Sequence, residues 1–228
     1  MSYIAILSIV VGLILLLPFL EKSGKRIIIF LMTGMFCCLF ASELNNLVLK
    51  AFYNDVLYTT TTITPVLEEV IKALPVIYYA VFFSDNEKKL ISVSFSIGIG
   101  FAIYENLIVL ITNLGTVTVQ WALIRGFGAV LIHGLCTVLV GVGVSYIRKE
   151  KKLARCGTYG LLMSAIIYHS LFNLLVQSDL VVIGAVLPVV TYIPAVMLLR
   201  RFVYAEKPEK EESTKADSAE TANADTPQ

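Results

Sequence analysis

The sequence predicts an all-α fold, a polytopic transmembrane helical bundle with about seven spans. Of the 228 residues, 57% are hydrophobic and only 15% are charged, and the mean hydropathy is +0.80. A chain with so few polar side chains cannot cover the surface of a soluble domain. Apolar runs that are long enough to cross a hydrocarbon layer of ~30 Å recur along the chain, so we expect it to cross a membrane repeatedly.

Each apolar run is expected to be a helix, because a helix satisfies the hydrogen bonds of its own backbone within lipid. The first run begins without a basic segment and contains no small-residue cleavage site, which favours a retained span over a removable signal peptide. The expected spans are Tyr3–Leu20, Ile27–Leu44, Pro65–Phe83, Leu90–Thr112, Phe127–Ile147, Thr158–Val176 and Leu180–Leu199.

Basic residues gather in alternate loops of this arrangement. They are frequent in 21–26 and 148–155, whereas 113–120 and 177–179 contain no Lys or Arg. The positive-inside rule therefore predicts that the N-terminus lies outside and the C-terminus in the cytoplasm. We expect a membrane domain over residues 1–204 and, because apolar residues become scarce, a disordered cytoplasmic tail over 205–228. The basic residues form no stripe, and no nucleic-acid partner is expected.

Several ionisable side chains lie inside the apolar runs. Each costs about 2.5–3.5 kcal/mol on insertion scales, so such residues usually serve a function. In the predicted orientation they share one depth, in the outer third to half of the membrane, although they come from four spans. This shared depth predicts a polar chamber, lined by Glu68, Glu69, Glu105, His133 and His169.

Neighbouring residues suit such a chamber. Thr64 and Pro65 are typical of a helix start, where the amide dipoles favour a carboxylate. Lys72 follows the two glutamates by one turn and can pair with one of them. His169 and Asn173 are spaced i, i+4 and are expected to direct two donors to one place.

Structural roles compete with these functional ones. Glu69 and Lys72 could form a purely structural ion pair, and His133 or Asn173 could simply bridge helices. Arg125 has the pattern of an interfacial anchor, and Asn45 that of a helix interface. Several small residues are expected to let the fourth and fifth spans pack closely, namely Gly98, Gly100, Ala102, Gly126, Gly128 and Gly134.

The order of the polar residues resembles a family pattern. Glu68-Glu69-Val-Ile-Lys72, Phe101-Ala-Ile-Tyr-Glu105, a lone His133 and His169-Ser-Leu-Phe-Asn173 are similar to the motif series of the PrsW family. That family comprises bacterial membrane proteases related to the type II CAAX prenyl endopeptidases. Some members carry an acid where this chain has Asn173.

The resemblance implies peptide-bond hydrolysis near the outer face of a bacterial cell membrane, with membrane-anchored proteins such as anti-sigma factors as substrates. It implies that Glu68 is the general base, that Glu69 tunes it, and that His169 and Asn173 stabilise the oxyanion. Glu105 would lie at the catalytic water, His133 would orient Glu105 or shuttle a proton, and Lys72 and Phe101 would support the site. A carboxylate in a partly buried site is a competent base, and His and Asn donors suit a tetrahedral intermediate.

The residues leave other possibilities open. The absence of an H-E-x-x-H helix favours a mechanism without a cofactor, although the carboxylates and imidazoles could also ligate zinc. A proton- or cation-coupled transporter would use similar buried groups, but it should carry charges in the inner halves of its helices as well. A catalytically dead scaffold and a CAAX-type prenyl protease are further alternatives. The sequence does not indicate the oligomeric state.

Overall fold

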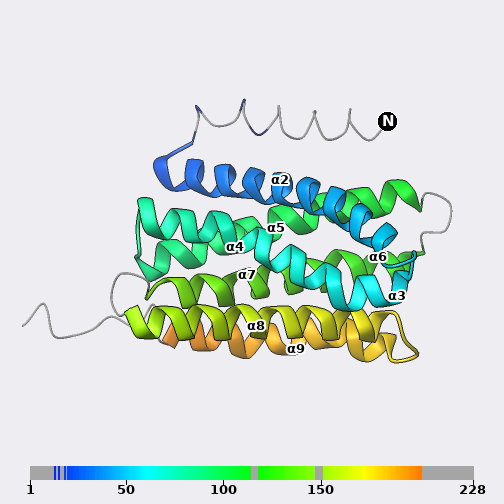
Figure 1. Ribbon diagram of the computed structural model, residues 1–228. Coiled ribbons are helices and arrows are strands. Elements are labelled where there is room, and N and C mark those ends of the chain that lie inside the picture. The colour runs from blue at the N-terminus through cyan, green and yellow to red at the C-terminus, as the bar shows by residue number, and fades with distance from the viewer. Residues whose placement is uncertain are drawn as a thin grey trace, which may run out of the picture. The chain divides into compact units, whose positions relative to one another are not determined.

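The computed structural model describes residues 13, 15, 18, 20–113, 118–146 and 151–201, without the side chains of 151–155. Every regular element in these ranges is a helix, which confirms the all-α prediction for the described chain (Figure 1). The elements are α2 (Lys22–Ala51), α3 (Val56–Tyr58), the π-helix η2 (Thr59–Ile63), α4 (Thr64–Phe82), α5 (Glu87–Thr112), α6 (Val119–Leu123), the π-helix η3 (Ile124–Ala129), α7 (Val130–Val144), α8 (Lys151–Val176) and α9 (Val181–Leu199).

Five of the described helical segments are long and apolar enough to cross a membrane. They are Lys22–Ala51, Glu87–Thr112, Val119–Val144, Cys156–Val176 and Val181–Leu199. Helix α4 carries Glu68, Glu69 and Lys72 and is too charged to be counted with them by composition. Most of the expected first span, Tyr3–Leu20, and the whole tail from 205 to 228 lie outside the described residues. The number of seven spans and the orientation therefore stay predictions.

Within Met1–Ala195, which form one compact unit, α5 packs between α2 and α7, and α7 also packs against α8 (Figure 1). Helix α4 contacts α2, α5, α7 and α8, so it packs against four of the long helices. The remaining residues, Val196–Gln228, form a second unit that is described only as far as Arg201 and contains the end of α9.

Glycines allow the close packing around α5. A Cβ added to Gly98 would lie 2.4 Å from the carbonyl oxygen of His133, so α5 and α7 touch backbone to backbone. Gly100 was expected at the same interface, but it faces α2 instead, where an added Cβ would lie 1.9 Å from the Leu31 oxygen. The direction of Gly100 follows from the helical period, because residues two apart point to different sides.

Two π-helical segments precede the helices that carry most of the site. The run from Val56 continues through η2 into α4, and the run from Val119 continues through η3 into α7. The prediction that Thr64 caps a new helix is therefore wrong. Its predecessor Ile63 already has helical φ and ψ and makes no side-chain cap, so α4 begins inside a continuous helical run.

Candidate active site and metal centre

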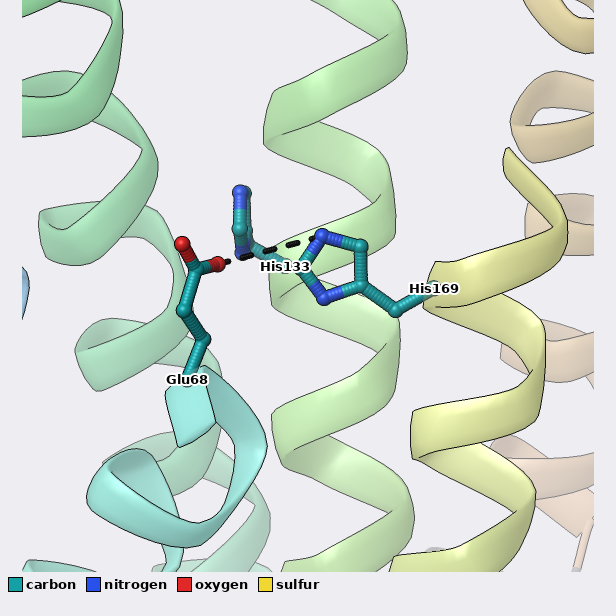
Figure 2. A group of neighbouring side chains, drawn as sticks. All are labelled: Glu68, His133 and His169. Carbon is teal, nitrogen blue, oxygen red and sulfur yellow. Dashed lines mark ion pairs between the residues drawn. The ribbon is translucent and has the colours of Figure 1, made fainter. Parts of the chain in front are cut away.

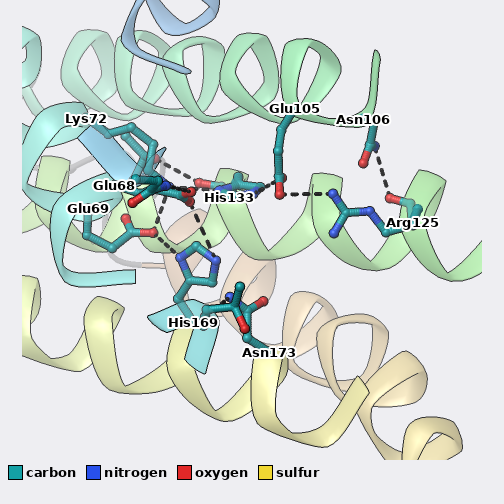
Figure 3. A network of polar contacts seen from close by, with 12 residues as sticks. Glu68, Glu69, Lys72, Glu105, Asn106, Arg125, His133, His169 and Asn173 are labelled. Carbon is teal, nitrogen blue, oxygen red and sulfur yellow. Dashed lines mark hydrogen bonds and ion pairs between the residues drawn. The ribbon is translucent and has the colours of Figure 1, made fainter. Parts of the chain in front are cut away.

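The predicted polar residues meet between α4, α5, α7 and α8 (Figure 3). Helix α4 supplies Glu68, Glu69 and Lys72, which are 5%, 0% and 0% exposed. His133 on α7 and His169 on α8 are buried as well. Glu105 on α5 retains 25% exposure of its side chain. Four segments that are distant in the sequence thus converge on one polar centre.

Glu69 lies at the most deeply buried part of this centre. Its Oε1 atom accepts from Lys72 Nζ at 2.6 Å and lies 2.8 Å from His169 Nδ1. A carboxylate oxygen can only accept, so Nδ1 of His169 carries the proton and Nε2 offers a lone pair. That Nε2 atom lies 3.9 Å from Oε2 of Glu68 (Figure 2). The second oxygen of Glu69 is buried and has no hydrogen-bond partner among the described residues.

His133 makes the corresponding contacts on the other side of Lys72. Its Nδ1 atom lies 2.9 Å from Lys72 Nζ, and its Nε2 atom lies 2.8 Å from Glu105 Oε2. An ammonium can only donate, so Nδ1 accepts and Nε2–H donates to Glu105. Phe101 lies beside both groups, with its ring centroid 4.9 Å from that of His133 and 4.7 Å from Lys72 Nζ. Phe101 is therefore an apolar neighbour of both groups, and its supporting role stays a prediction.

Two partners of the site were not predicted as such. Arg125 was expected at the membrane interface, but its Nη2 atom lies 2.9 Å from Glu105 Oε1. Asn45 was expected at a helix interface, but its Nδ2 donates to Glu68 Oε1 at 3.3 Å. Asn45 ends a predicted outward-running span at the same depth as the glutamates, so the shared-depth argument could have included it. For Arg125 the sequence gives no comparable signal, because no sequence pattern indicates that Arg125 lies in a π-helical segment.

Asn173 differs from its expected position. Its Nδ2 donates to the backbone oxygen of Thr60 at 3.0 Å, whereas His169 contacts Glu69. The two side chains share a face of α8, as their spacing predicts, but the hydrogen bonds described for them go to different partners.

The donor set fits a metal ion. One oxygen of Glu68 and one ring nitrogen each of His133 and His169 lie within 4.8 Å of one another. Oε2 of Glu68 is buried and has no hydrogen-bond partner in the described part of the chain, which leaves it available as a ligand. Each imidazole is held by a second carboxylate, Glu69 or Glu105, which is the usual way in which proteins orient metal-binding histidines. A carboxylate with two imidazoles matches common zinc sites with an open position.

A buried metal-type donor set inside apolar helices is what a membrane-embedded metallohydrolase requires. A family model described as PrsW family intramembrane metalloprotease matches residues 8–199. The chain belongs to this family. It is therefore an intramembrane protease, which hydrolyses peptide bonds, and a multi-pass membrane protein.

No curated protein and no solved structure matches the chain. The sequence alone favours a site without a cofactor. The family description, which names a metalloprotease, does not support this preference, and neither does the donor set of Glu68, His133 and His169. Both point to a metal site, the alternative that the sequence left open with zinc as the ion.

Proposed function

We propose that this protein is a metal-dependent intramembrane endopeptidase in which Glu68, His133 and His169 hold a zinc ion. The observation that carries the proposal is the convergence of these three groups within 4.8 Å of one another, with one Glu68 oxygen buried and unpartnered. The carboxylate partners of both histidines support it, because such partners fix the tautomer in which the other ring nitrogen is unprotonated. At His133 this nitrogen is Nδ1, which accepts from Lys72 Nζ at 2.9 Å, so zinc binding would require Lys72 to withdraw from it.

The zinc ion would supply a Lewis acid for the scissile carbonyl and a site at which water is activated. The protein then has to move protons and exclude bulk water. Lys72 and His169 hold Oε1 of Glu69, and Oε2, which has no hydrogen-bond partner among the described residues, would take a proton from the attacking water. The proton passes to the leaving amine as the peptide C–N bond breaks, which yields a carboxylic acid and an amine.

We propose membrane-anchored proteins, such as anti-sigma factors, as substrates and a bacterial cell membrane as the location. The family resemblance supports this choice, and so does the position of the site among helices apolar enough to span a bilayer. In the orientation that the loop charges predict, the site lies in the outer half of the membrane.

One observation favours a second mechanism that uses no metal. Lys72 Nζ lies 2.9 Å from His133 Nδ1. At this position the positive charge of Lys72 already balances negative charge of the carboxylates in the site. In that mechanism Glu68 is the general base, with its unpartnered Oε2 facing the water, and His169 stabilises the oxyanion. The two mechanisms share residues but differ in their response to metal removal.

The deciding experiment reconstitutes the purified protein with a single-span membrane substrate and measures cleavage. We expect Glu68→Ala and Glu105→Ala to lower cleavage at least 100-fold, whereas Glu43→Ala, at an exposed glutamate of α2, leaves it unchanged. Unchanged cleavage in both site variants would refute the assignment. We expect a chelator to abolish cleavage and zinc to restore it. Full activity in the chelator, with Glu68→Ala inactive, would establish the metal-free mechanism instead.

A further inference from the structure

The π-helical segments η2 and η3 stand in equivalent places relative to the site. Segment η2 leads into α4, which carries Glu68, and segment η3 leads into α7, which carries His133. π-Helical turns are rare and occur frequently at functional sites. Here each of two π-helical segments directly precedes a helix that carries a residue of the metal-type set. This raises the question of which contacts stabilise the two segments.

An asparagine side chain from a neighbouring helix binds each segment. Asn173 Nδ2 on α8 donates to the Thr60 backbone oxygen in η2 at 3.0 Å. Asn106 Nδ2 on α5 donates to the Arg125 backbone oxygen in η3 at 3.1 Å (Figure 3). We call these two contacts the asparagine clamps. Each clamped oxygen belongs to the residue eight positions before Glu68 or His133.

The clamps also connect the site helices in pairs. Asn106 directly follows Glu105, whose carboxylate holds the ring of His133. Asn173 lies one turn after His169, whose ring faces Glu68. One clamp therefore joins α5 to α7 and the other joins α8 to α4. Each joins two helices whose side chains must meet in the site.

The register of α4 and α7 makes these bonds important. A π turn contains an extra residue relative to the α-helix, so its loss or displacement shifts the following helix by one position. Such a shift moves a side chain by about 1.5 Å along the axis and by about 100° around it. Either change would separate atoms that now lie within 4.8 Å, because a site tolerates only about 0.5 Å of misplacement.

We propose that Asn106 and Asn173 are positioning residues that fix the register of α7 and α4 through the two π segments. The proposal rests on the proposed metal site and gives Asn173 a different task from direct oxyanion stabilisation. Asn106 has no role in the chemistry described above, and its amide contacts only the backbone of η3 among the described hydrogen bonds.

The test measures zinc affinity, by competition with a chromophoric chelator, for the full-length protein in lipid nanodiscs. We expect Asn106→Leu and Asn173→Leu each to weaken zinc binding about 10–100-fold. The matched control is Asn113→Leu, just after α5, which removes an amide-to-carbonyl bond of 2.8 Å to Val109 and a bond of 3.1 Å to the Thr112 hydroxyl, both local to the end of that helix. That control should retain the wild-type affinity, and Asn106→Gln, which keeps a donor, should recover part of the loss.

Three outcomes would overturn the proposal. One is wild-type zinc affinity in both leucine variants, and another is an equal loss in the Asn113 control. The third is a fall in kcat of Asn173→Leu at unchanged zinc affinity, since this would place Asn173 in the chemistry itself. If a leucine variant does not fold, the smaller Asn106→Ala and Asn173→Ala variants give the same comparison.

Failure of the metal site is distinguishable from failure of the clamps. A wild-type protein that binds no zinc refutes the metal-dependent function. Amide hydrogen exchange then tests the clamps separately. We expect Asn106→Leu to increase exchange over 124–135 but not over 59–70. We expect Asn173→Leu to increase exchange over 59–70 but not over 124–135. Unchanged exchange in both segments would overturn the clamp proposal.

Discussion

The two histidines of the site are held alike but face different neighbours. Each donates one ring N–H to a carboxylate, His169 to Glu69 and His133 to Glu105. The other nitrogen of His169 faces the unpartnered oxygen of Glu68 at 3.9 Å, whereas that of His133 accepts from Lys72 at 2.9 Å. His169 is thus ready to bind a cation, while His133 already contacts the cation that the protein supplies.

Their supporting carboxylates differ in a second way. Glu69 and Lys72 are both 0% exposed, and we call them, with His169, the sealed half. Glu105 and Arg125 retain 25% and 21% exposure, and with His133 they form the open half. A buried charge that loses its partner costs far more than an exposed one. The sealed half should therefore govern stability, and the open half should govern access of water and substrate.

The largest expected effect separates the two halves by stability. Glu69→Ala leaves the ammonium of Lys72 buried without its carboxylate, which should cost about 3–5 kcal/mol. Glu105→Ala breaks a partly exposed ion pair and should cost about 1 kcal/mol or less. Thermal unfolding in detergent measures both. The double variant Glu69→Ala, Lys72→Met should recover part of the loss, and equal losses in the two single variants would contradict the division into halves.

A smaller effect is expected at the backbone of the open half. Gly98→Ala places a Cβ 2.4 Å from the His133 carbonyl oxygen, so α7 must move away from α5. Overpacking of this kind costs about 1–3 kcal/mol and should also weaken zinc binding. The control Gly160→Ala adds a Cβ with no atom within 4 Å and should be neutral or slightly stabilising. Equal behaviour of the two variants would show that α5 and α7 do not depend on this contact.

A still smaller effect on stability is expected for Arg125. Arg125→Met removes the partner of Glu105 Oε1 at 2.9 Å, and because the pair is partly exposed, less than about 1 kcal/mol of stability should be lost. Activity should fall about tenfold, because Glu105 then holds His133 less firmly. The measurement is kcat and KM for the reconstituted substrate, with Arg125→Lys as the variant that keeps the charge. A full loss of folding would place Arg125 in the sealed half instead.

The part of the site on α4 is the easiest to predict from the sequence, because its residues are close together in one helix. Glu68, Glu69 and Lys72 lie within one turn of α4, so their common face follows from the helical period. The cost of ionisable groups in lipid then singles out Glu105, His133 and His169, since only a polar centre explains them. Five of the expected spans follow in the same way from hydropathy alone.

The partners that complete the site could not be predicted in this way. Arg125 lies at the end of an apolar run, where an arginine ordinarily reaches the membrane surface. In the structure it lies in η3, its backbone oxygen accepts from Asn106, and its side chain lies against Glu105. The sequences of η2 and η3 show no pattern that distinguishes a π turn from an α turn. The same limit explains why the Asn173 bond to Thr60 was not foreseen.

The smallest expected effect concerns Asn45, which touches the residue between the two halves. Its bond to Glu68 Oε1 is long, at 3.3 Å, so Asn45→Leu should cost only about 0.5–1 kcal/mol, or a factor of about two to five in kcat/KM. The neighbouring Asn46 has no hydrogen bond to Glu68 among the described residues, and Asn46→Leu is the matched control. A loss at Asn45 larger than that of Arg125→Met would mean that the orientation of Glu68 limits the reaction more than the open half does. In that case the orientation of Glu68, which His169 faces, would affect the reaction more than the difference between the two histidines does.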